Sequence, residues 1–412
     1  MAITVTKDEI DIRDKLSELD RPVGVAGHAM MKAETPQEQF NLIKAGRRRL
    51  SINGCMSIWQ RGTSMAPVPG GQAFYLADRF SFRESTDIVA NYYQSTDVPP
   101  GQGFKYSAKI NTTGLDEAIA STQYSRFQYL MEGQDALVFG YGTPEAKPVT
   151  VSFWVKSAVA GKYPLSIEVP DGYRICVKSY TIDRQDTWEH KVVTFPPLTS
   201  SGVTVGSTTD LGWKLTMPLV VGSAYQDDAN EGKWRTDGAY RMGLSGCANP
   251  FRASGDIWFM TGVQIEVGSH ATPFEHRSYG EELALCERYF FSLTGGYAGS
   301  TYLGSPVSPT GDNGIMNFAV WDSANCYGVI HFPNSMRVPP SIANDGSQSE
   351  ANSFRLYSAG STMDTSNFKF MNSSTDRCEL VFEHNGSLTT GNAGWVRLQN
   401  GAELWFDAEL TP

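Results

Sequence analysis

The strongest constraint on the fold is the stretch at residues 256–267, where side chains alternate in character with a period of two. One set of alternate positions is mainly apolar and comprises Ile257, Phe259, Thr261, Val263, Ile265 and Val267. The other set comprises Trp258, Met260, Gly262, Gln264 and Glu266. Because successive side chains of a β-strand point to opposite faces, the stretch predicts a long strand whose first set forms its apolar face.

The same alternation recurs along most of the chain. It is found in Val151–Val155 and in Leu211–Leu215, and turn sequences such as Pro170–Gly172 separate the alternating runs. Glycine (40 residues) and proline (21 residues) are plentiful and charged residues make up only 19% of the chain, which is typical of short strands joined by tight turns. The pattern predicts a mainly β protein built on an antiparallel sandwich of the jelly-roll type.

Two segments depart from this texture and predict helices. The charged first 50 residues contain Thr35 and Glu38 at the spacing of a reciprocal helix cap, with Pro36 at the first helical position. Later, Leu283, Cys286 and Phe290 lie on one helical stripe within residues 278–291. We therefore expect four parts: a short α-helical N-terminal head (1–50), a jelly-roll domain (51–277), a linking helix (278–291) and a C-terminal β-sandwich (292–412).

Charge and cysteine usage limit the partners and the compartment. The net charge is −10 and Arg47–Arg49 is the one basic cluster, so no binding to nucleic acid is expected. No apolar run approaches the roughly 18 residues of a membrane span, and the first residues lack the pattern of a signal peptide. The six cysteines contain no CxxC pair, which favours reduced, mostly buried thiols and assembly in the host cytoplasm.

The sequence contains no motif for catalysis, a metal or a cofactor. His270 and His276 have the wrong spacing for two metal ligands on a helix, and Asp227–Gly232 lacks the alternating carboxylates of a calcium loop. Glu281 and Glu282 fit a helix start, where carboxylates are stabilised by the helix dipole. We expect no catalytic residue, no metal and no cofactor, and therefore no enzyme. A catalytic pair of carboxylates facing each other across a cleft is the one alternative that the sequence leaves open.

Four tryptophans are the candidate binding residues. Trp154, Trp258 and Trp405 fall opposite the apolar positions of their strands, and Trp395 lies opposite Val396 and Leu398. An outward aromatic ring can stack on a sugar, and it can equally be buried between subunits or under a second layer of chain. Both interpretations stay open at this point.

Two long motifs resemble a domain that recurs in phage tail-fibre and other virion proteins. They are Ala45–Ser64 (AGRRRLSINGCMSIWQRGTS) with Tyr75–Phe80 (YLADRF), and Thr261–Phe290, which includes GVQIEVGSHATPFEHRSYGEELALCERYF. Between them, Thr150–Ser157 is similar to a core strand of carbohydrate-binding-module jelly rolls. The resemblance implies a homotrimeric fibre of the virion that attaches to host surface glycans, and it transfers no catalytic residue.

The favoured interpretation is a phage tail-fibre or receptor-binding subunit, anchored to other tail or particle proteins through residues 1–50. Host attachment is expected in residues 292–412, which offer polar loops at Ser341–Asn352 and Ser358–Asn367. A capsid-surface or collar fibre with the same domains is the first alternative. A glycan depolymerase is the alternative from a different class, but the chain lacks the fixed-period repeat of a long β-helix.

Overall fold

The structure is a computed structural model in which residues 49–412 belong to one structural unit. It describes residues 49–410, except 69, 72, 295–315, 345–353, 366, 385–387 and 399–402, together with Lys32. The predicted helical head and its anchoring role lie almost entirely outside the described residues. The described chain is mainly β, with antiparallel sheets, which confirms the predicted fold class at this level.

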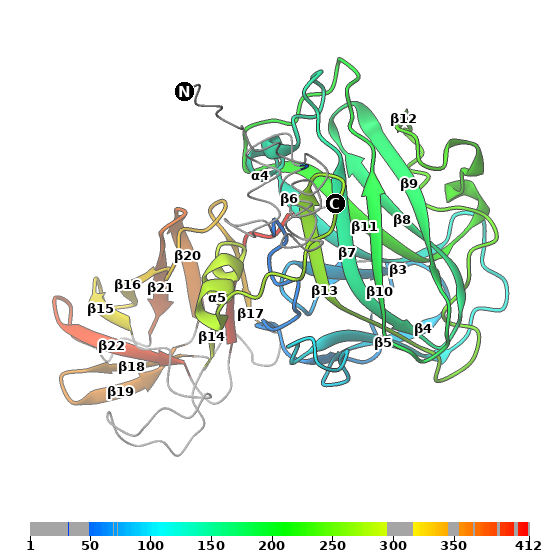
Figure 1. Cartoon of the computed structure of the whole chain (residues 1–412). Helices are drawn as coiled ribbons and strands as arrows, with labels where there is room; N and C mark the ends of the chain where they lie inside the picture. The colour runs from blue at the N-terminus through cyan, green and yellow to red at the C-terminus, as the bar shows by residue number, and fades with distance from the viewer. Residues whose placement is uncertain are drawn as a thin grey trace, which may run out of the picture. The chain divides into compact units, whose positions relative to one another are not determined.

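Residues 49–277 form two antiparallel sheets, and Figure 1 labels strands of both. Sheet 1 has the order β1 (Ser64–Met65), β4 (Val89–Ser95), β5 (Ser107–Gly114), β13 (Ile257–Val267), β7 (Val149–Ser157) and β10 (Glu189–Phe195). Sheet 2 has the order β12 (Arg235–Thr236), β9 (Arg174–Ile182), β8 (Gly161–Val169), β11 (Leu211–Val221), β6 (Tyr124–Glu132), β3 (Phe80–Glu84) and β2 (Ala73–Tyr75). A short helix, α4 (Gly133–Ala136), follows β6.

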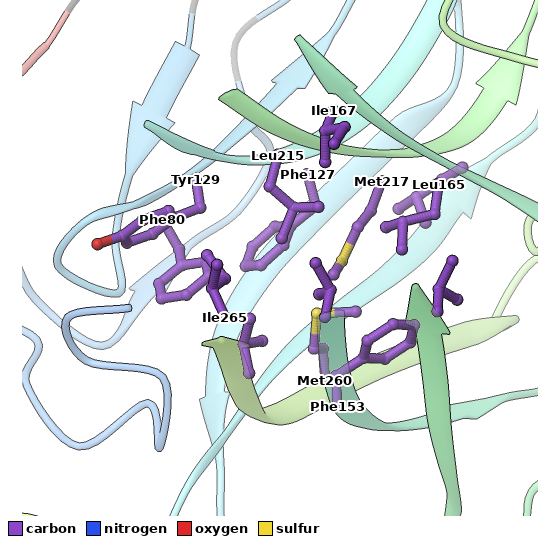
Figure 2. Close-up of a cluster of buried hydrophobic side chains, with 14 of the residues drawn as sticks. Phe80, Phe127, Tyr129, Phe153, Leu165, Ile167, Leu215, Met217, Met260 and Ile265 are labelled. Atoms are coloured by element: carbon purple, nitrogen blue, oxygen red, sulfur yellow. The ribbon is translucent and has the colours of Figure 1, made fainter. Parts of the chain in front are cut away.

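One large apolar core lies between sheets 1 and 2. Figure 2 shows side chains from both sheets meeting there, including Phe153, Met260 and Ile265 from sheet 1 and Phe127 and Leu215 from sheet 2. Alternate residues of β7 and β11 enter this core, as the period-two pattern of these strands predicts. Each fully buried aliphatic or aromatic side chain contributes roughly 1.5–3 kcal/mol through the hydrophobic effect.

Strand β13 departs from a simple alternation at Gly262. Its pairing with β7 shifts there, and Gly262 has a φ of +66°. A β-bulge adds one residue to a strand and so exchanges the faces on either side of it. Trp258 consequently points into the same core as Val263 and Ile265 and is fully buried. The prediction that Trp258 lies opposite the apolar face is wrong for this physical reason.

The C-terminal part consists of two further antiparallel sheets. Sheet 3 has the order β14 (Phe290–Thr294), β23 (Glu403–Asp407) and β17 (Ser341–Asn344). Sheet 4 has the order β19 (Ser361–Asp364), β18 (Phe354–Ser358), β22 (Ala393–Leu398), β15 (Met316–Val320), β16 (Asn325–His331), β21 (Arg377–Glu383) and β20 (Asn367–Ser373). Apolar side chains from both sheets form a second core.

The predicted linking helix is shorter than expected. Helix α5 spans Tyr279–Glu287, and the side chain of Ser278 accepts a hydrogen bond from the Glu281 amide at its start. Phe290 already belongs to β14, so the apolar stripe expected to reach it ends at Cys286. Among the described residues, neither α-helix is long and apolar enough to cross a membrane.

Polar residues of the two motifs are buried around Glu282 of α5. The Glu282 carboxylate forms an ion pair with Arg49. It also accepts hydrogen bonds from the backbone N–H of Asn53 and from the Arg277 guanidinium. Asn53 has a φ of +56°, and its side chain binds the backbone around Ile58. The carboxylate was expected only to favour the helix dipole. In the structure, the Glu282 carboxylate links Arg49 and Asn53 to α5 through an ion pair and a hydrogen bond.

A second buried polar cluster joins the ADRF sequence to the C-terminal end of the chain. Arg79 forms an ion pair with Glu409 and donates to the carbonyl oxygen of Leu130 at 2.6 Å. Asp78 accepts hydrogen bonds from the backbone and the side chain of Gln60 at 3.1 and 2.6 Å. Burial raises the pKa of Asp78 to about 6, against the opposing effect of the Arg61 cation. These motif residues therefore form buried polar contacts between segments that are distant in the sequence.

Candidate functional site

Trp395 is the most exposed of the four predicted tryptophans. It lies on β22 directly opposite Tyr357 of β18, and the two rings stack with centroids 3.8 Å apart and planes 3° from parallel. Its neighbours Val396 and Leu398 face the second core and are buried, as the alternation predicts. Because 38% of Trp395 remains exposed, the pair presents an aromatic surface on the outer face of sheet 4.

A shallow cavity adjoins this aromatic pair. Its volume is about 290 Å³, and it is lined by Tyr357, Trp395, Ala393, Gly394 and the turn at residues 358–362. The turn contributes the hydroxyl-bearing residues Ser361 and Thr362. The cavity thus combines ring surfaces with groups that can donate and accept hydrogen bonds, which is the mixture that orients small polar ligands in protein pockets.

The turn beside the cavity is a tight β-hairpin. Ser358 pairs with Ser361 across it, and the two central residues, Ala359 and Gly360, have φ values of +50° and +80°. Positive φ at both central positions matches the two-residue turns that fit the twist of a hairpin. The prediction of a long polar loop at Ser358–Asn367 is therefore wrong, because β18 ends at Ser358, β19 spans Ser361–Asp364 and β20 begins at Asn367. Most of the other predicted loop, Ser341–Asn352, lies outside the described residues.

Trp405 lies on β23 and belongs to sheet 3, whereas Trp395 belongs to sheet 4. The Trp405 ring is partly buried and its edge packs against Phe290, with centroids 5.7 Å apart. The two candidate binding residues of the C-terminal segment, Trp395 and Trp405, therefore lie in different sheets. The structure does not bring them together in one surface.

Trp154 lies on the outer face of sheet 1, as the alternation predicts, but other parts of the chain lie over this face. Its ring centroid is 5.2 Å from that of His190, and Phe104 approaches from a loop that also contacts Phe274 and His276. Trp154 is consequently only partly exposed. The alternative of burial under a second layer of chain applies to this tryptophan in part.

Two aromatic residues of sheet 4 are absent from the sequence-based candidates. Tyr357 alternates with the buried residues Phe354 and Leu356, so its outward direction was readable, but its pairing with Trp395 depends on strand register. Trp321 follows β15, is 69% exposed and lies 5.6 Å from the ring of Tyr327. Trp321 does not line the cavity beside the Tyr357–Trp395 pair.

The arrangement suits binding of a neutral, hydroxylated ring. The apolar face of such a ring can stack on an aromatic side chain while its hydroxyl groups bond to polar groups nearby. Within the part of the chain that the structure describes, no group of three His, Cys, Asp or Glu side chains could hold a metal ion. The six cysteines are all free thiols, as expected, and four of them are buried.

No protein-family model and no curated protein sequence matches this chain. Comparison with solved structures does find similar folds over about half of it. A family 11 carbohydrate-binding module from Clostridium thermocellum, solved with a mixed-linked tetrasaccharide, has a TM-score of 0.25 and 12% identity and covers 52% of this chain and 99% of the module. The C-terminal family 22 carbohydrate-binding module of Xyn10B from the same organism has a TM-score of 0.28 and 9% identity and covers 52% of this chain and 98% of the module.

The enzymatically active domain of tailspike protein 4 from bacteriophage CBA120 is also similar. Its TM-score is 0.28 and its identity 10%, over 53% of this chain. The match spans only 21% of that tailspike chain. Likeness at these TM-scores and identities carries no argument about what this chain binds, so the assignment of a ligand rests on the site itself.

Proposed function

We propose that this protein is a structural protein of a phage particle that binds host surface glycan through the Tyr357–Trp395 pair. The carrying observation is the parallel stack of these two rings beside a 290 Å³ cavity with a hydroxyl-bearing turn. An exposed aromatic surface costs stability in water, and a ligand that covers it regains that free energy.

The virion role is supported by the two motifs that resemble tail-fibre proteins. In this proposal residues 1–50 dock on another tail or particle protein, and the chain assembles as a homotrimer. A trimer presents three copies of the site, and linked sites gain roughly 10²–10⁴ in avidity over a single weak contact. A shallow site then suffices for firm attachment.

Two other functions remain to be separated from this one by experiment. A capsid-surface or collar fibre would have the same site and differ only in its location, which labelled electron microscopy of the particle would reveal. A glycan depolymerase would release oligosaccharide continuously. We expect purified protein to release no reducing ends from host capsule or lipopolysaccharide, and sustained release would establish the enzyme instead.

Binding is tested first with the full chain on an array of bacterial surface glycans. The wild-type protein should bind a defined subset of glycans, and Trp395→Ala should lose that subset. Trp321→Ala is the matched control, because it removes an even more exposed tryptophan from the same part of the chain. If Trp395→Ala and Trp321→Ala both bind as the wild type does, the Tyr357–Trp395 pair is not the site.

The oligomeric state is tested separately by native mass spectrometry at micromolar concentration. We expect three copies of the 45.2 kDa chain. A purely monomeric protein would contradict the trimer and, with it, the avidity argument.

A further inference from the structure

The outer face of sheet 2 carries two arginines on adjacent strands. Arg83 of β3 lies directly opposite Arg126 of β6, while the neighbouring residues Phe82 and Phe127 point to the other side, into the core. Directly opposed side chains of antiparallel strands lie about 5 Å apart at their Cβ atoms, and like charges in such a pair repel each other. The fold therefore holds two cations together at a cost in stability.

Neither arginine has a carboxylate partner among the described residues. The Nη1 atom of Arg126 is 3.7 Å from the sulfur of Met242, and the Nε atoms of both arginines are buried without a hydrogen-bond acceptor. The neighbouring acid Glu168 is bound instead to Lys214, 3.1 Å away. Burial, together with the Arg83 cation, lowers the pKa of Arg126, although Tyr124, Glu168 and Tyr225 oppose this shift.

This pair contrasts with other arginines that lie buried or partly buried in the fold. Arg49 is paired with Glu282, Arg79 with Glu409, and Arg288 with Glu132. Because an uncompensated cation in a partly desolvated position is unfavourable, natural proteins usually neutralise it within the fold. An anion from outside would complete the hydrogen bonding that the chain itself leaves open.

The surroundings of the two arginines indicate which kind of anion fits. The ring of Tyr124 lies 4.6 Å from the guanidinium of Arg126 and 5.7 Å from that of Arg83, and Tyr225 packs on Tyr124 edge-on. Gln128, two residues along the same face, donates to Thr216 at 2.9 Å, while its buried carbonyl oxygen Oε1 has no donor. The face thus offers guanidinium groups beside an aromatic surface, while the Gln128 oxygen lies buried beneath it.

We infer that Arg83 and Arg126 form a binding site for the acidic substituent, a carboxylate or a phosphate, of a charged saccharide. The guanidinium fork matches either oxyanion through paired hydrogen bonds, and Tyr124 provides a surface for the sugar ring. The whole chain carries a charge of −10, so a local cation pair would offset the repulsion of an acidic glycan. The inference rests on the proposed glycan-binding function and adds a second, charge-selective site.

Calorimetric titration of the full chain tests this site. The ligands are an oligomer of galacturonic acid, the galactose oligomer of the same length and inorganic phosphate, at 50 and 300 mM NaCl. The wild type should bind the acidic oligomer at least about tenfold more tightly than the neutral one, and the difference should shrink at high salt. Phosphate competition with the acidic oligomer would show that the site accepts either oxyanion, whereas its absence would narrow the ligand to carboxylates.

The variants Arg83→Gln and Arg126→Gln should each weaken binding of the acidic oligomer roughly 10- to 100-fold, as expected for loss of a charged hydrogen-bond donor. Arg126→Lys, which keeps the charge and loses the fork, should fall between them and the wild type. Arg174→Gln is the matched control, because Arg174 lies on β9 of the same sheet and is also without a salt bridge among the described residues.

A structural role would give a different pattern from a binding role. Removing one of two repelling charges should leave the melting temperature unchanged or raise it, whereas loss of a structural arginine would lower it. Trp395→Ala should leave acidic-oligomer binding intact, which separates this site from the Tyr357–Trp395 pair. Equal affinity for acidic and neutral oligomers, undetectable binding of every anion, or wild-type affinity in both glutamine variants would each overturn the inference.

Discussion

Trp258 and Trp154 in the first region have different surroundings from Trp395 and Trp321 in the C-terminal part. In residues 49–277, Trp258 fills the core between sheets 1 and 2, and Trp154 is half-covered by loops of the same chain. In the C-terminal part, Trp395 and Trp321 remain on the outside of sheet 4. The difference teaches that an outward position in a sequence pattern is only the first condition for a binding residue. The second is that the face stays uncovered.

The largest expected effect is the loss of Trp258. Trp258→Ala should lower the free energy of unfolding by about 3–5 kcal/mol, because it removes a fully buried ring from the main core. Trp395→Ala should change stability by less than about 1 kcal/mol, as surface substitutions usually do. Urea denaturation of both variants measures the contrast, and equal losses would erase the distinction between the two regions.

The stability of the buried polar cluster around Asp78 should depend on pH, unlike that of the exposed Tyr357–Trp395 pair. Burial raises the pKa of Asp78 to about 6 from its usual 3.8, so the folded state holds this proton more tightly than the unfolded state. The contribution of Asp78 to stability is thus greatest below pH 4 and falls by roughly 2–3 kcal/mol as the pH rises through 6.

Asp78→Asn should remove this dependence, since an amide does not titrate. The measurement is the difference in unfolding free energy between wild type and Asp78→Asn at pH 4, 5, 6 and 7. A difference that stays constant with pH would show that Asp78 has an ordinary pKa in the folded protein.

The bulge that turns Trp258 inward can be tested through its glycine. A Cβ atom at position 262 would lie 2.7 Å from the ring of Phe104, and a φ of +66° is unfavourable for any residue with a side chain. Gly262→Ala should therefore cost roughly 1–3 kcal/mol. Gly255→Ala is the control, because Gly255 also has a positive φ but has open space around it. Equal costs would mean that contact with Phe104 contributes nothing.

Much of the fold could be predicted from the sequence because it depends on local patterns. Period-two alternation correctly predicted the strand β7 and the outward direction of Trp395. It failed at Trp258, because a single bulge exchanges the faces of the strand on its two sides. The bulge is visible only in the pairing with β7. The loop predicted at 358–367 failed because a two-residue turn is hard to distinguish from a longer polar segment.

The candidate sites were harder to predict because they depend on which strands become neighbours. Trp395 was found from its own strand, but Tyr357 became its partner only through the register of β18 and β22. Arg83 and Arg126 are far apart in the chain and meet only because β3 pairs with β6. The motif residues Asp78 and Arg79 were noticed as a resemblance, and their role in a buried polar cluster came from the tertiary structure.

The central claim is that the Tyr357–Trp395 pair binds glycan, and one paired measurement tests it most directly. For the tightest glycan found on the array, the dissociation constants and melting temperatures of wild type, Trp395→Ala and Trp321→Ala are measured on the same samples. Trp395→Ala should weaken binding by about 1–3 kcal/mol, or roughly 5- to 150-fold, by analogy with aromatic stacking on bases, with its melting temperature nearly unchanged. Unchanged affinity in Trp395→Ala, or an equal loss in Trp321→Ala, would contradict the claim.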